Sequence, residues 1–135
     1  MHHKTVTEHF AVAPQISPED VETIKSLGYT AIINNRPDDE VPGQPTNAMI
    51  ESAAKSAGLA YYHLPITSGQ IPAAAIDQTK QRIEEIDGPT FAFCRSGTRS
   101  ITLWALSQKG QMPSENILNA VANAGYDLPF LTHYL

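Results

Sequence analysis

The feature that most constrains the fold is the regular alternation of strand-like and helix-like segments along the 135 residues. Short apolar runs predict strands, and apolar residues three or four apart predict helices. The predicted strands span residues 10–13, 30–34, 60–66 and 90–93, and the predicted helices span residues 17–28, 46–57, 72–86, 99–108 and 114–125. This order predicts an α/β fold with a mainly parallel sheet and right-handed crossovers. We expect the 10–13 strand at a sheet edge, and Met49, Ile50 and Ala53 facing the core.

The length and composition favour one globular domain over residues 1–135. Hydrophobic residues make up 41% of the chain and charged residues 17%. The net charge of −5 and the absence of a basic patch argue against nucleic-acid and membrane-lipid partners. The single cysteine excludes an internal disulfide and a cysteine-rich metal site, and the histidines lack metal-ligand spacing. We therefore expect a cytoplasmic protein without metal or cofactor.

Three predicted loops follow strands, over residues 35–43, 67–71 and 94–99. The carboxyl ends of parallel strands meet at one edge of a sheet, which is where ligands bind in such folds. We therefore expect the three loops to converge and to form the functional site.

The third loop contains the only cysteine, Cys94, directly after a strand and before a helix. Backbone N–H groups of such a loop, together with the helix N-terminus, form a site for an anion and favour a thiolate. Gly97 allows the tight turn, and the guanidinium of at least one of the flanking arginines, Arg95 and Arg99, can fork onto an oxyanion. The predicted anion-binding loop consists of Arg95, Ser96, Gly97, Thr98, Arg99 and Ser100. We predict that Cys94 is a catalytic nucleophile assisted by one of these arginines, Arg99 or Arg95.

The loop at 35–43 offers two further candidates. Arg36 is predicted to position the substrate, and Asp38 to act as a general acid, with Asp39 as its geometric alternative. The competing interpretation is that Arg36 and Asp38 pair with each other and only fix the loop. His63 lies inside the third predicted strand. We favour a structural role for it over a catalytic contact with the cysteine.

The spacing and the wider sequence resemble known families. Cys94, four residues and then Arg99-Ser100 match the loop length of rhodanese-type sulfurtransferases, whereas tyrosine phosphatases have five intervening residues. From about residue 8 to about 130, however, the chain resembles the phosphatase-like domain of bacterial beta-lactamase hydrolase-like proteins. The segments that carry this resemblance are Ser17 to Gly28, Asn35-Arg36-Pro37-Asp38, Gly58 to Pro65, Cys94 to Leu106 and Ala124-Gly125-Tyr126-Asp127-Leu128.

This resemblance implies a three-layer α/β/α fold, like that of protein tyrosine and dual-specificity phosphatases, with a four-stranded, mainly parallel sheet. It also implies Cys94 as the nucleophile, and residues 95–99 with Arg99 as the anion site. Some members are fused to a persulfide dioxygenase, which implies a functional link to such an enzyme.

Three functions follow from these observations. The short loop and the lack of an acid at 65–70 favour a sulfurtransferase that carries sulfane sulfur as a Cys94 persulfide, with a persulfide or thiosulfate as substrate. The family resemblance favours a phosphatase that hydrolyses a phosphate ester through a Cys94 phosphocysteine. A non-enzymatic module that binds oxyanions or senses sulfide is the third. Since a thiolate or sulfite leaves without a proton, the sequence favours sulfur transfer.

Overall fold

The computed structural model describes residues 1–135 and contains a sheet of five strands in the order β1-β2-β5-β3-β4. The strands are β1 (Lys4–Thr7), β2 (Phe10–Ala13), β3 (Ala31–Asn34), β4 (Ala60–His63) and β5 (Thr90–Phe93). The four predicted strands are all present and run parallel to one another. The α/β prediction with a mainly parallel sheet is therefore confirmed.

The sheet has one strand more than the predicted four. Strand β1 pairs antiparallel with β2 as a hairpin, so the predicted edge position of residues 10–13 is wrong, and β1 is the edge. Strand β1 has the sequence Lys-Thr-Val-Thr and is only partly covered. With one apolar residue in four, it lacks the hydrophobic alternation that marks a strand in sequence. Polar, short strands of this kind are typical of sheet edges.

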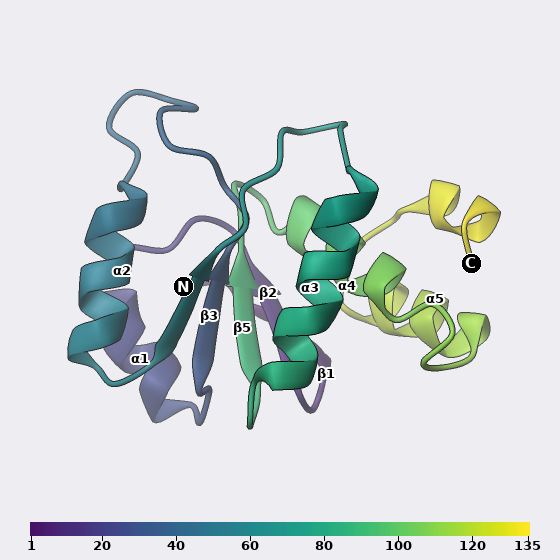
Figure 1. Cartoon of the computed structure of the whole chain (residues 1–135), viewed down its shortest axis with the longest axis horizontal. Coiled ribbons are helices and arrows are strands. Elements are labelled where there is room, and N and C mark those ends of the chain that lie inside the picture. The colour runs from purple at the N-terminus through teal and green to yellow at the C-terminus, as the bar shows by residue number, and fades with distance from the viewer.

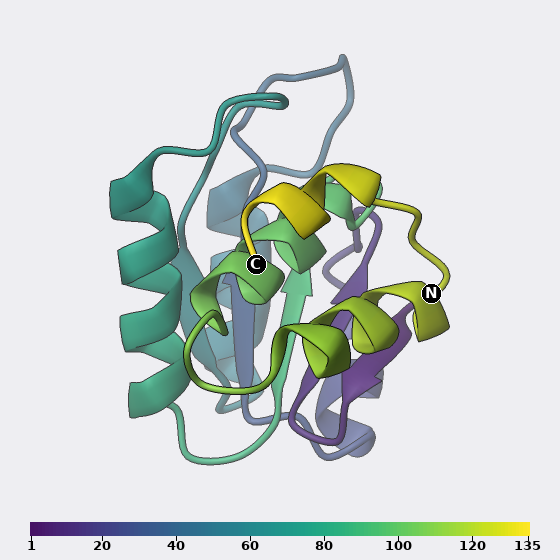
Figure 2. The ribbon, with the colours of Figure 1, turned by 90° about the vertical axis from the view of Figure 1, so that its right-hand side faces the viewer.

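Helices cover both faces of the sheet, which gives the predicted three layers (Figure 1). One face carries α1 (Asp20–Ser26) and α2 (Asn47–Ser56). The other carries α3 (Ala73–Glu85), α4 (Thr98–Ser107) and α5 (Ser114–Asn123), followed by the short 3-10 helix η1 (Pro129–His133). Figure 2 shows α4, α5 and η1 in front of the sheet, with α3 beside them. None of the helices has the length and apolarity needed to cross a lipid bilayer.

The core divides into two main clusters because successive side chains of a strand point to opposite faces. Ala11, Ile32 and Phe91 join the cluster beneath α1 and α2. Val12 and Ile33 join the cluster beneath α4 and α5. Strands β2, β3 and β5 are therefore buried throughout and fixed on both faces.

Helix α2 confirms the predicted segment but turns a slightly different face inward. Its buried residues are Ile50 and Ala54, whereas Met49 is 50% exposed and Ala53 is only partly buried. The Thr46 hydroxyl accepts a hydrogen bond from the backbone N–H of Met49 and so fixes the start of the helix. The predicted inward position of Met49 is therefore wrong, because the apolar stripe runs through residues 50 and 54.

Loops follow the carboxyl ends of β3, β4 and β5 at one edge of the sheet, at the top of the view in Figure 1. Backbone hydrogen bonds join them: the N–H of Asn35 donates to Phe93 O, and the N–H of Ile66 donates to Asn35 O. The three loops therefore converge as the strand order predicts.

Candidate active site

The cysteine loop connects β5, at the centre of the sheet, to the first turn of α4. Cys94 has no exposed area, and its backbone N–H donates to Ala13 O at 3.3 Å. The N–H of Gly97 donates to Cys94 Sγ at 3.1 Å. A backbone donor directed at the sulfur, next to a helix N-terminus, stabilises negative charge there. The loop thus curls around the sulfur.

Gly97 is required at this bend for two reasons. Its φ of +90° is one that side chains oppose, and a Cβ would lie 2.1 Å from the hydroxyl oxygen of Tyr126. The Tyr126 hydroxyl itself donates to Ser96 O at 3.0 Å and closes the loop from outside. Burial raises the pKa of Tyr126, and the nearby Cys94 contributes to the same shift.

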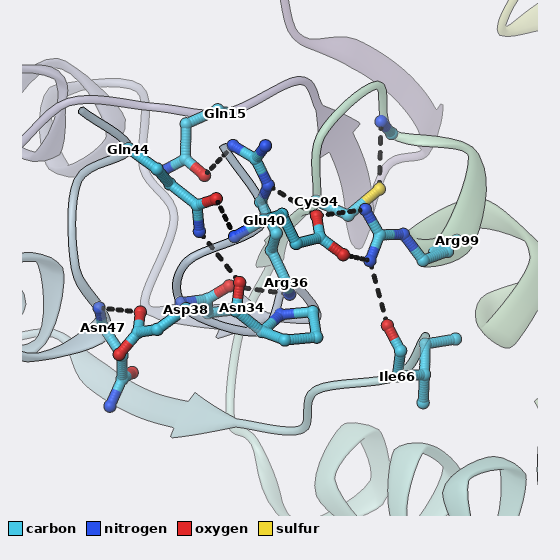
Figure 3. Close-up of polar contacts among 12 residues, drawn as sticks. Gln15, Asn34, Arg36, Asp38, Glu40, Gln44, Asn47, Ile66, Cys94 and Arg99 are labelled. Atoms are coloured by element: carbon cyan, nitrogen blue, oxygen red, sulfur yellow. Dashed lines mark hydrogen bonds and ion pairs between the residues drawn. The ribbon is translucent and has the colours of Figure 1, made fainter. Parts of the chain in front are cut away.

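Arg99 lies on the first turn of α4 with only 7% of its surface exposed. Its NH1 donates to Ile66 O at 2.9 Å and to Glu40 Oε2 at 2.7 Å, and its NH2 donates to Glu40 Oε1 at 2.8 Å. The hydrogen bonds that Arg99 donates to Glu40 raise the pKa of Arg99, and Cys94 contributes to the same shift. Figure 3 shows the guanidinium next to both the Glu40 carboxylate and the Cys94 sulfur.

Glu40 is the carboxylate that holds this arrangement together. Besides Arg99, it accepts a hydrogen bond from Nε of Arg36 at 2.8 Å. The hydrogen bonds from Arg99, together with the charge and hydrogen bond of Arg36, lower the pKa of Glu40 from 4.5 to about 2 against the opposing effect of its burial. It is therefore ionised at neutral pH and bridges two guanidinium groups.

The sequence interpretation missed Glu40. The available signal was the presence of two arginines next to buried strand ends, Arg36 and Arg99. A guanidinium is not buried without an anion, so a carboxylate had to be near them. The chain around residues 35–43 holds three candidates, Asp38, Asp39 and Glu40, and only the fold selects among them.

Arg36 is 3% exposed, and its hydrogen bonds go to neighbouring side chains of the site. Its NH1 donates to Gln15 Oε1 at 3.1 Å, its backbone N–H donates to Asn34 Oδ1 at 2.9 Å, and its Nε binds Glu40. The proposed pairing with Asp38 is not formed. The carbonyl oxygen of Arg36 lies 3.0 Å from Nε2 of His63, so the histidine holds the 35–43 loop against β4.

Asp38, the predicted general acid, is turned toward α2. Its Oδ1 accepts a hydrogen bond from the backbone N–H of Asn47 at 2.7 Å, at the first residue of that helix. Figure 3 shows the Asp38 side chain directed toward Asn47 and away from Cys94. Asp39, the alternative, is exposed and has a φ of +63°. The structure brings Arg99 to Cys94 but does not bring Asp38 to it.

The remaining loop side chains divide by burial. Ser100 is buried and donates to Asn35 Oδ1 at 2.8 Å, so it ties α4 to the end of β3. The Ser96 hydroxyl donates to the Thr98 hydroxyl at 3.0 Å on the exposed rim. Arg95 is also exposed, and its carbonyl oxygen accepts the N–H of Gln15 at 3.3 Å. No group of three or more His, Cys, Asp or Glu side chains is placed to hold a metal ion.

Comparison with known proteins identifies the family. Residues 2–111 match the family described as "Beta-lactamase hydrolase-like protein, phosphatase-like domain". A beta-lactamase hydrolase-like protein of Agrobacterium fabrum (strain C58) is 36% identical over 132 residues, which cover 96% of this chain and 31% of that protein. The corresponding protein of Xylella fastidiosa (strain Temecula1) is 36% identical over 91% of this chain and 29% of its own length. The chain thus spans about a third of these relatives.

Solved structures agree with this assignment. A candidate phosphatase from Neisseria meningitidis superposes with a TM-score of 0.84 at 33% identity, covering 97% of this chain and 94% of that one. The active form of Tk-PTP superposes with a TM-score of 0.73 at 15% identity over 98% of this chain and 92% of its own, which supports the fold alone. The chain belongs to the family of beta-lactamase hydrolase-like phosphatase-like domains and has the protein tyrosine phosphatase-like fold.

Proposed function

We propose that this domain is a cysteine-dependent phosphatase that hydrolyses small phosphomonoesters. The observation that carries the proposal is the Gly97 N–H directed at Cys94 Sγ, with the buried guanidinium of Arg99 beside the same sulfur. A thiolate held by these donors is the nucleophile that such a reaction needs, and the guanidinium can bind the oxygens of a phosphoryl group. The family and its phosphatase-like relatives support this alternative better than the sulfurtransferase that the sequence favoured.

The proposed reaction has two steps. The Cys94 thiolate attacks phosphorus, a phosphocysteine forms, and the ester P–O bond breaks with departure of the alkoxide, which takes up a proton. Water then attacks the phosphocysteine, inorganic phosphate leaves, and the thiolate is regenerated. Arg99 and the loop N–H groups stabilise the charge on the phosphoryl oxygens in both steps.

The alkoxide that leaves in the first step needs a proton source. Asp38 remains the proposed acid because it lies on a loop at the active edge, although its carboxylate binds the N-terminus of α2. Acid assistance contributes about 10²–10⁴ in rate. We therefore expect Asp38→Asn to slow alkyl ester hydrolysis far more than hydrolysis of an activated aryl ester. Equal effects on both esters would remove Asp38 from this role.

The test of the main proposal is turnover of p-nitrophenyl phosphate. The wild-type chain should release phosphate steadily, and Cys94→Ser and Arg99→Ala should abolish release. Ser107→Ala, a buried serine that bonds only within α4 and Gln108, serves as the control for a nonspecific loss of activity. Absence of wild-type turnover, or activity that survives Cys94→Ser, would refute phosphatase chemistry at this site.

Sulfur transfer remains the second candidate, and specific observations favour it. The loop has only four residues between Cys94 and Arg99. The neighbouring loop at 67–71 contains no Asp or Glu that could protonate a leaving group. In this reaction the thiolate attacks the sulfane sulfur of thiosulfate, and sulfite leaves without a proton. An adduct of about 32 Da on Cys94 after incubation with thiosulfate, and sulfur transfer to a thiol, would favour it over the phosphatase. A functional link to a persulfide dioxygenase stays a prediction from the resemblance.

A further inference from the structure

Two adjoining cavities lie near the cysteine loop. The first has a volume of about 230 Å³ and is lined by the loop residues Arg95, Ser96, Thr98 and Arg99, among others. The second has a volume of about 430 Å³ and is lined by Gly69, Ile71, Ile76, Leu106, Phe130 and Tyr134. Gly69, Ile71 and Phe130 line both cavities. The two cavities therefore adjoin at these three residues, and together they are called the groove.

The two ends of this groove differ sharply in chemistry. The end at the loop is lined by the guanidinium groups of Arg95 and Arg99 and by four hydroxyl side chains, those of Ser68, Ser96, Thr98 and Thr102. Five of the six residues that line the far end are hydrophobic. A groove that is cationic at one end and apolar at the other matches a ligand with a negative head and an apolar tail.

Two exposed aromatic side chains mark the apolar end. Phe130 and Tyr134, on and just after η1, are 40% and 58% exposed, and their ring centroids lie 6.4 Å apart in an edge-to-face arrangement. They face Ile76 of α3 and Leu106 of α4 across the cavity. Large apolar side chains left in contact with water around a hollow next to an active site are typical of a ligand-binding surface.

We propose that the substrate is an amphiphilic phosphomonoester whose alcohol is an unbranched apolar chain, long enough to pass Gly69 and enter the second cavity. This inference rests on the proposed phosphatase function. The phosphate binds at the cysteine loop, the first carbons of the chain occupy the first cavity, and the rest of the chain packs against Ile71, Leu106 and Phe130. Of these two cavities, only the second, at about 430 Å³, falls in the size range of small-molecule sites, about 300–1,000 Å³. A short ester fills the first cavity alone and leaves the apolar surface exposed.

The experiment measures kcat/KM for straight-chain alkyl phosphates from ethyl to decyl, by phosphate release below their micelle concentrations. The expected result is a rise with chain length, at most about fourfold for each fully buried methylene and at least about tenfold across the series. In Phe130→Ala the gain in kcat/KM from ethyl to decyl phosphate should shrink severalfold. Met49→Ala, an equally exposed apolar residue on the other face of the sheet, should keep the full gain.

Binding to Cys94→Ser separates this inference from the proposed function. Calorimetry should give octyl phosphate at least about tenfold tighter binding than ethyl phosphate, and Phe130→Ala in that background should reduce the difference. Wild-type turnover that is flat across the series, with equal affinities in Cys94→Ser, overturns the inference and leaves the phosphatase intact. If no ester is hydrolysed, the phosphatase proposal fails. The ratio of the two affinities then still decides whether the groove selects apolar chains.

Discussion

The carboxylate of Glu40 provides the sharpest test of the site's electrostatics. It accepts three charge-assisted hydrogen bonds, two from Arg99 and one from Arg36, and its pKa falls from 4.5 to about 2. Glu40→Gln keeps the shape of the side chain but removes its charge. Two guanidinium groups that are less than a tenth exposed then lose their anion, and such a loss is destabilising.

The magnitude follows from the pKa shift. A lowered pKa in the folded state contributes stability that is fully present above the unfolded pKa of 4.5 and is lost as the pH falls through about 2. The full shift corresponds to about 3 kcal/mol at pH 7 and about 1.4 kcal/mol at pH 3. Because 22% of the side chain is in contact with solvent, screening reduces these values to about 2 and about 1 kcal/mol.

The assay is urea unfolding of wild type and Glu40→Gln at pH 7 and pH 3, monitored by the fluorescence of Trp104. Trp104 is the only tryptophan and is 3% exposed, so it reports loss of the core. The difference in free energy of unfolding between the two proteins should fall by about half from pH 7 to pH 3, because other groups titrate alike in both.

Glu51→Gln is the matched control, since Glu51 pairs only with Lys55 at 3.4 Å on the exposed face of α2. Its effect should stay within about 0.5 kcal/mol at both pH values. A wild-type advantage over Glu40→Gln that is the same at pH 7 and pH 3, or a variant more stable than wild type, would refute the reasoning.

Three further predictions concern the surroundings of the loop. Gly97→Ala should cost about 1–3 kcal/mol in urea unfolding, because of its positive φ and the clash with the Tyr126 hydroxyl, and should cost less in a Tyr126→Phe background; additive effects would refute the clash. Ser100→Ala should cost about 1–3 kcal/mol by leaving Asn35 Oδ1 without its donor, and an unchanged urea midpoint would contradict this. Burial raises the pKa of Tyr61 to about 12, so ultraviolet titration should show a late-ionising tyrosine that disappears in Tyr61→Phe.

Most of the fold was accessible from the sequence because its signals are local. Buried strands such as residues 90–93 are continuous apolar runs, and the helices between them start and stop at caps and glycines. Their alternation then leaves few topologies. The strand β1 escaped because a partly exposed edge strand of Lys and Thr carries almost no hydrophobic pattern.

The site was accessible in part, for a related reason. Cys94, Gly97 and Arg99 lie within six residues, so their meeting is decided by one loop. Glu40 and Arg99 are separated by 59 positions, and their pairing depends on how the 35–43 loop crosses the sheet edge. The Asp38 side chain points toward α2 because its carboxylate accepts the backbone N–H of Asn47, which has no partner within the helix. No pattern in the sequence reports such a contact between a loop and a distant helix end.

The complete burial of the Cys94 sulfur has a consequence for its chemistry. An electrophile of any kind can reach an atom without accessible surface only while its neighbours are displaced, so the frequency of that displacement limits how fast the thiol is alkylated or oxidised. An anion that pairs with the guanidinium can assist the displacement by competing with Glu40, whereas an uncharged oxidant cannot. The enclosure should therefore slow the reaction of the thiol with peroxide more than its reaction with a charged substrate.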